Sequence, residues 1–172
     1  MPLAGDWDGS ESPLMLLGAA GSATDLEPLT MGALAPIIPA AIDAWAAAGI
    51  SESELDLLRG VTVAIADLNG TRLGQATSQA IVLDVDAAGR GWFIDPTPWD
   101  HTEFTLASRD SSLAAQDRVD LLTVLAHELG HVLGLEHDAL DDVMDSLLPV
   151  GTRRLPGDLD LVDRVFGEGW NQ

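Results

Sequence analysis

The stretch HELGHVLGLEH, residues 127–137, decides the interpretation of this chain, because it contains three of the four histidines. His127 and His131 are four residues apart, and in a helix this spacing places both imidazoles on one face, about one turn apart. The glycine three residues after His131 can adopt the left-handed conformation that ends a helix, which would turn His137 back toward the other two histidines. Three neutral imidazoles beside the carboxylate of Glu128 are typical of a catalytic zinc site.

A bare HExxH pair is less specific, since such pairs also occur on ordinary amphipathic helices. The glycine and the third histidine at this spacing make a fortuitous polar helix the weaker interpretation. The motif therefore predicts a zinc site.

The pattern His127-Glu128-x-x-His131-x-x-Gly134-x-x-His137 resembles the signature of the metzincin metallopeptidases. These proteins carry a methionine turn after the third histidine, and Met144 in the sequence DVMD is similar to that methionine, although many methionines simply fill gaps in a core. The resemblance implies a general base at Glu128. It implies three zinc ligands, which are His127, His131 and His137.

Weaker similarity extends over about residues 34–167 and points to the matrixin branch. It is carried by three short patterns and a C-terminal segment: Ala41-Ile42-x-x-Trp45, Leu73-Gly74-x-Ala76, Ile81-Val82-Leu83-Asp84-x-Asp86, and Leu155-Pro156-x-Asp158 through Phe166-Gly167. The resemblance implies an α+β fold, with a twisted mixed sheet, two long helices above it, and a small irregular C-terminal subdomain that ends in a helix. A substrate cleft would run between the two subdomains.

We expect residues 1–33 to form an N-terminal arm, partly ordered or similar to a pro-segment, and residues 34–172 to form the metzincin-like catalytic domain. Hydrophobic periodicity and capping residues predict the elements of that domain. The predicted helices are 37–48, a short one from Ser51 to Gly60, 117–133 or 120–133 with an aspartate cap, and 158–166. The predicted strands are 61–68, 79–85 and 91–95.

Composition limits the partners of the chain. Its net charge of −20 arises from 28 acidic residues against eight basic ones, so neither nucleic acid nor an anionic membrane surface is an expected partner. Uninterrupted apolar runs stay below membrane-spanning length. There is no cysteine, so disulfides are excluded. We expect a monomer that acts on a peptide or protein substrate.

Localisation follows from the resemblance, which implies a secreted, extracellular protein. A signal peptide is not visible in residues 1–10, which lack both a basic residue and an apolar segment. The chain is therefore expected to be a mature form or a domain of a longer secreted protein.

The sequence also contains candidate ligands for a second zinc and for calcium. Matrixins hold a second, structural zinc with upstream histidines, and here only His101 lies upstream, so that site is not expected. Calcium is a further candidate at Asp84 and Asp86, near two glycines, with a solvated acidic turn as the alternative.

The predicted activity is that of a zinc-dependent endopeptidase, which hydrolyses peptide bonds by a zinc-bound water with Glu128 as general base. The strand 79–85, or the segment just before it, is the candidate edge for pairing with an extended substrate. The alternative is a non-catalytic or latent zinc-binding module of a larger secreted or surface protein. In a latent form, an aspartate of the arm such as Asp6 could occupy the open position of the metal.

Overall fold

A three-stranded mixed sheet forms one side of the molecule. The computed structural model describes residues 13–22, 25–104, 113–137 and 143–157. Strands β2 (Thr62–Ala66) and β4 (Ala80–Asp84) pair in parallel, and β3 (Gly74–Ala76) pairs antiparallel with β4, which gives the order β2-β4-β3. Runs of β-branched residues favour β2 and β4, and the Asn69-Gly70 turn follows β2 as predicted, with Gly70 at φ 76°.

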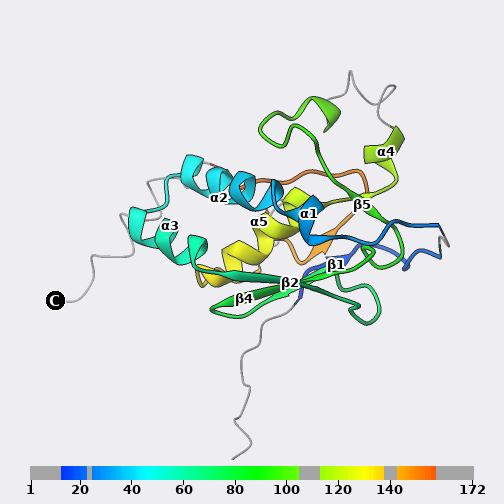
Figure 1. Ribbon diagram of the computed structural model, residues 1–172, viewed down its shortest axis with the longest axis horizontal. Helices are drawn as coiled ribbons and strands as arrows, with labels where there is room; N and C mark the ends of the chain where they lie inside the picture. Colours follow the sequence, from blue (N-terminus) through cyan, green and yellow to red (C-terminus); the bar gives the residue numbers. More distant parts are fainter. Residues whose placement is uncertain (1–12, 23–24, 105–112, 138–142, 158–172) are drawn as a thin grey trace, which may run out of the picture.

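Two helices are stacked on one face of this sheet (Figure 1). Helix α5 (Leu121–Val132) lies between the sheet and helix α2 (Ile37–Ala47), and every residue of α5 except His131 is buried. A helix that is covered on all sides carries apolar residues around most of its circumference, and α5 is such a helix. The indole nitrogen of Trp45 in α2 donates to the carbonyl oxygen of Ala126 in α5 at 2.9 Å, which fixes the two helices together.

Shorter helices complete the α part. Helix α3 (Glu52–Arg59) begins at Ser51 with a capping box to Glu54 and is followed by Gly60, as predicted. Helices α1 (Met31–Leu34) and α4 (Leu113–Gln116) and the 3-10 helix η1 (Thr102–Phe104) were not predicted. Each is one turn long, which is too short to produce a periodic hydrophobic pattern. The predicted helix 158–166 lies outside the described residues.

Two further strand pairs lie beside the main sheet. Strand β5 (Trp92–Phe93) pairs in parallel with β6 (Val119–Asp120), which leads directly into α5. Strand β1 (Met15–Leu16) pairs in parallel with β7 (Leu147–Leu148). The N-terminal arm therefore reaches the core, where Leu14, Leu16 and Leu29 are buried. The division of the chain at residue 34 stays a prediction.

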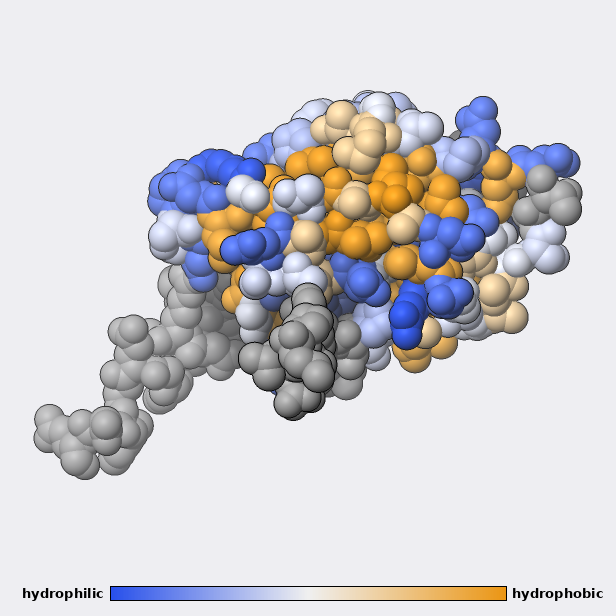
Figure 2. Space-filling model, turned by 60° about the horizontal axis from the view of Figure 1, so that its bottom comes forward, coloured by the Kyte–Doolittle hydropathy of each residue, from blue (hydrophilic) through white to orange (hydrophobic). Residues whose placement is uncertain are grey.

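The prediction of an edge strand named two alternatives, and the structure confirms the second. The strand 79–85 is not an edge, because β4 is paired on both sides, so that the edge is β3, the segment just before it. Residues 73–76, whose pattern resembles a matrixin loop, contain this strand. The prediction of an irregular C-terminal subdomain was wrong at Leu147–Leu148, which form the short strand β7. Figure 2 views the molecule from the sheet side, where apolar residues gather in the centre and hydrophilic residues surround them.

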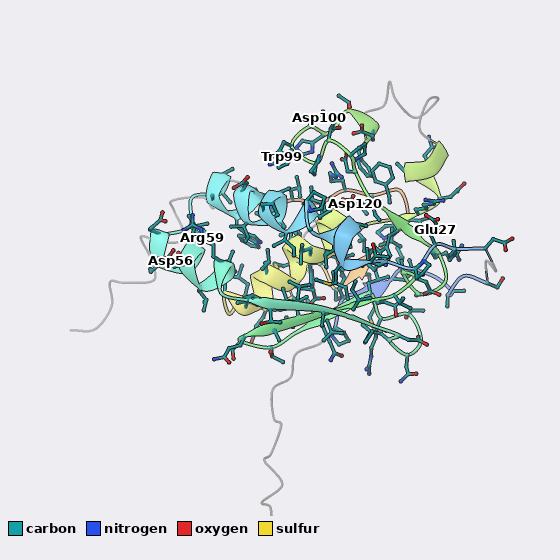
Figure 3. All side chains as sticks on the ribbon, viewed as in Figure 1. Glu27, Asp56, Arg59, Trp99, Asp100 and Asp120 are labelled. Carbon is teal, nitrogen blue, oxygen red and sulfur yellow. The ribbon has the colours of Figure 1, made fainter. Side chains whose placement is uncertain are left out.

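A buried ion pair connects the C-terminal part of the described chain to the start of α5. The side chain of Arg153 is 4% exposed and lies 2.7 Å from a carboxylate oxygen of Asp95 and 2.8 Å from one of Asp120. Asp120 is the N-cap of α5 and accepts from the backbone N–H of Thr123 at 3.1 Å. Figure 3 shows Asp120 close to strand β5, far from the exposed Asp56 and Arg59 on α3.

Candidate metal centre

The end of α5 gives the histidine cluster its shape. Gly134, at φ 83°, donates to the carbonyl oxygen of His131 at 2.9 Å, and Leu135 donates to that of Gly130 at 3.0 Å. These two bonds form a Schellman motif, in which a left-handed glycine reverses the chain after the last helical turn. The reversal brings His137 back to the helix, as the sequence predicts.

The three predicted histidines meet at one point. The Nε2 atoms of His127 and His131 are 3.0 Å apart, and each lies 3.2 Å from the Nε2 of His137. Zinc bound tetrahedrally at about 2.0–2.1 Å from each nitrogen requires separations of about 3.3–3.4 Å. The spacing is close to that value, so the residues fit a zinc ion. Among the described residues, these histidines are the one group of three or more potential ligand side chains that could hold a metal.

Backbone carbonyl groups orient two of the rings. Nδ1 of His127 lies 2.7 Å from the carbonyl oxygen of Val143, and Nδ1 of His131 lies 2.8 Å from that of Leu135. A carbonyl oxygen can only accept, so we assign the ring proton to Nδ1 in both residues. Both Nε2 lone pairs then point into the cluster, where a cation would relieve their repulsion. Outer hydrogen bonds of this kind are typical of metal-ligating histidines.

The histidine cluster has a buried side and a side that is partly exposed to solvent. His127 and Glu128 are both fully buried, whereas His131 and His137 are partly exposed. Burial lowers the pKa of His127 to about 3 and also lowers the pKa of His137. Two of the three imidazoles are thereby favoured in the neutral form that binds metal. Access from solvent is on the side of His131 and His137.

Met144, which resembles the methionine of the family's turn, packs against the helix that carries His127 and His131. Its side chain is 4% exposed and packs against Gly130, one residue before His131. A Cβ atom on Gly130 would collide with the Met144 sulfur and lie 3.0 Å from Cζ2 of Trp45. The absence of a side chain at Gly130 thus permits the close approach of Met144 to the helix.

Glu128 lies against the edge strand of the sheet. A Cβ atom on Gly74 of β3 would be 2.7 Å from Oε1 of Glu128. The carboxylate of Glu128 therefore lies between α5 and β3, on the residue that follows His127. In the sequence, Gly74 belongs only to a pattern that resembles a matrixin loop. That pattern does not predict the close approach of Gly74 to Glu128.

The other metal predictions concern residues away from this cluster. His101 is exposed. The two carboxylate oxygens of Asp84 accept from the backbone N–H groups of Leu68 and Ala88, both at 2.7 Å, and Asp86 accepts from Gly89 at 2.8 Å. These bonds organise the turn after β4, and calcium binding there stays a prediction.

Comparison with known families supports the resemblance. A family model described as Matrixin matches residues 62–163, which is more than half of the 172 residues and includes the whole histidine motif. The match starts at β2, so it is narrower than the expected span of residues 34–167. No curated protein matches the chain.

Proposed function

Since this chain belongs to the matrixin family, we propose that it is a zinc-dependent endopeptidase in which Glu128 acts as general base. The observation that supports this most strongly is the convergence of three Nε2 atoms within 3.0–3.2 Å of one another, with a buried glutamate beside them. His127, His131 and His137 would hold the metal. When bound, zinc would supply Lewis acidity to a water molecule and to the peptide carbonyl group.

Glu128 would move the protons of the reaction. Its carboxylate would take a proton from water as the water oxygen adds to the peptide carbonyl, and would then deliver the proton to the leaving nitrogen. The packing of Glu128 against Gly74 of β3 restricts the position of the carboxylate. Burial also limits competing contact with bulk water.

An extended substrate would bind along the edge strand β3. Main-chain pairing with a free edge supplies affinity without requiring a particular sequence. We propose peptides or proteins as substrates, a monomeric enzyme and an extracellular site of action. None of the helices in the described part of the chain is long and apolar enough to cross a membrane.

The test is hydrolysis of a quenched fluorescent peptide library, with and without a zinc chelator, together with metal analysis. We expect one zinc per chain and cleavage that stops when the chelator is added. Bound zinc without cleavage of any peptide would instead support the alternative, a latent or non-catalytic zinc-binding module.

A further inference from the structure

The segment Pro13–Leu16, here called the cleft segment, lies between the two backbones that border the histidine cluster. On one side Leu73 donates to the carbonyl oxygen of Leu14 at 2.9 Å, and Leu16 donates to that of Thr71 at 2.7 Å. On the other side Met15 donates to the carbonyl oxygen of Ser146 at 3.0 Å. The cleft segment is thus bound as an added strand, paired on both of its edges.

Both borders belong to the candidate active site. Residues 71–73 lead directly into β3, where Gly74 contacts Glu128. Residues 146–148 follow Met144, which packs against Gly130 of α5, and include β7, which belongs to the orange segment in Figure 1. A strand held between these two backbones occupies the position where an extended peptide would have to lie to reach Glu128.

The register of the pairing selects one peptide bond. Met15 is the antiparallel partner of Arg72, so Leu14 lies opposite Leu73 and Pro13 lies opposite Gly74. Gly74 is the residue at which a Cβ atom would lie 2.7 Å from Oε1 of Glu128. The carbonyl group of Pro13 is therefore the one that the register brings to the level of the general base.

The side chains along the cleft segment and the next residue alternate between buried and more exposed positions. Leu14 and Leu16 are 1% and 3% exposed, whereas Leu17 is 52% exposed. This alternation is that of a strand with one face in an apolar environment. The residue after the selected bond is thus an aliphatic side chain that is fully enclosed.

From this arrangement we propose that the protein cleaves its own chain between Pro13 and Leu14, with the cleft segment bound as an intramolecular substrate. The proposal rests on the proposed function. A water oxygen adds to the Pro13 carbonyl carbon and the Pro13–Leu14 C–N bond breaks. Pro13 becomes a carboxylate, and Glu128 passes the proton from water to the nitrogen of Leu14, which leaves as an amine. Residues 1–13 are released.

The first experiment determines the N-terminus of the full chain after incubation with zinc, by intact-mass spectrometry. We expect the wild type to begin at Leu14, at a rate independent of protein concentration, and Glu128→Gln to keep residues 1–13. Leu14→Asp should slow the cleavage more than about tenfold, because a carboxylate would have to enter an apolar site. Leu17→Asp, with its side chain in solvent, should be cleaved at nearly the wild-type rate.

A second experiment tests the binding of the cleft segment without any activity. The chain has no cysteine, so Met15→Cys combined with Arg72→Cys in the Glu128→Gln protein gives one pair of thiols. A pair that is directly opposite without mutual hydrogen bonds has a Cα separation of about 4.5 Å, which suits a disulfide. We expect rapid cross-linking on oxidation. Leu17→Cys with Arg72→Cys, a diagonal pair about 7–8 Å apart, should cross-link poorly.

The outcomes separate this proposal from the proposed function. Hydrolysis of added peptides by a chain that keeps residues 1–13 would overturn self-cleavage and leave the peptidase assignment intact. A new N-terminus at another residue, or faster cross-linking of the diagonal pair, would overturn the register. Failure to cleave any peptide, including its own, would overturn both proposals.

Discussion

His127 is the most buried of the three histidines in the cluster, and the Val143 carbonyl oxygen orients its ring. Burial lowers its pKa from 6.5 to about 3, so the folded chain without metal excludes a proton that the unfolded chain accepts. The stabilising contribution is fully present above about pH 6.5 and is lost progressively as the pH falls toward 3.

The first prediction concerns this pH dependence. The free energy of unfolding of the metal-free chain should fall between about pH 6.5 and pH 4, by an amount on the order of a few kcal/mol from His127. Urea titrations at several pH values, after removal of metal with a chelator, measure it. His127→Gln, which cannot take up a proton, should show a flatter profile. Equal slopes in both proteins would argue against a buried neutral imidazole.

Gly130 gives a second prediction at the residue scale. Gly130→Ala places a methyl group against Met144 and Trp45, so the free energy of unfolding should fall by about 1–3 kcal/mol. Gly32→Ala is the matched control, because the nearest atom to a Cβ at Gly32 is 3.9 Å away. Thermal unfolding should place the control at or slightly above the wild type. A Gly130→Ala protein as stable as the control would contradict the packing described here.

For single residues, the sequence predicts the members of the histidine cluster but not all of the groups that contact them. Spacing alone is sufficient to predict that His127, His131 and His137 converge, and that Glu128 lies beside them. The carbonyl groups of Val143 and Leu135, which orient two rings, have no sequence signal, because every residue has a carbonyl group. Gly74 is a similar case, since its role depends on the distance between β3 and α5.

The turn after α5 is the element that closes the histidine cluster. Gly134 has φ 83°, and no atom lies within 4 Å of the position that a Cβ would take, so an alanine there is strained only by its backbone conformation. Gly70, at φ 76° in the turn after β2, also has no such neighbour and lies outside the cluster. The two glycines therefore differ mainly in position, because Gly134 lies between two histidines of the candidate metal site and Gly70 does not.

The third prediction uses this pair. Gly134→Ala and Gly70→Ala should each lower the free energy of unfolding of the metal-free chain by about 1 kcal/mol. Gly134→Ala should also weaken zinc binding about tenfold, because it displaces His137 and the Leu135 carbonyl group that orients His131. Competition with a chromogenic chelator measures the affinity. Equal zinc affinity of both variants would contradict the role of the turn.

Sequence predicted the longer elements better than the short ones. Helices α2, α3 and α5 and strands β2 and β4 carry periodic patterns or capping residues that are visible locally. Strands β1, β3 and β7 are two or three residues long, and they exist because a partner strand from a distant part of the chain lies beside them. That partnership is a tertiary property, which explains why the sequence pattern alone does not distinguish β4 from an edge strand.

At the scale of the whole molecule, Arg153 joins the C-terminal part of the described chain to the loop after β5 and to the start of α5. Its guanidinium also lies over the Phe104 ring, 4.4 Å from the ring centroid. The neighbouring Arg154 pairs with Asp145 at 2.9 Å, next to Met144. The two arginines thus pair with the N-cap residue of α5 and with the residue that follows Met144.

The fourth prediction compares a buried and an exposed ion pair. Arg153→Leu leaves Asp95 and Asp120 buried without their cation, so the free energy of unfolding should fall by about 3–5 kcal/mol. Arg59→Leu removes a pair with Glu52 and Asp56 at the surface, where all three side chains are at least half exposed, and should leave stability nearly unchanged. Urea denaturation measures both. Similar losses in the two variants would contradict the role assigned to Arg153.

In the proposed function, metal binding and proton transfer belong to different residues, the three histidines and Glu128. The most direct test measures zinc content and the rate of peptide hydrolysis in the wild type and in Glu128→Gln, prepared in parallel. We predict one zinc per chain in both proteins, with hydrolysis reduced at least about a hundredfold in the variant. Hydrolysis at the wild-type rate by Glu128→Gln, or a wild type that binds no zinc, would contradict the central claim.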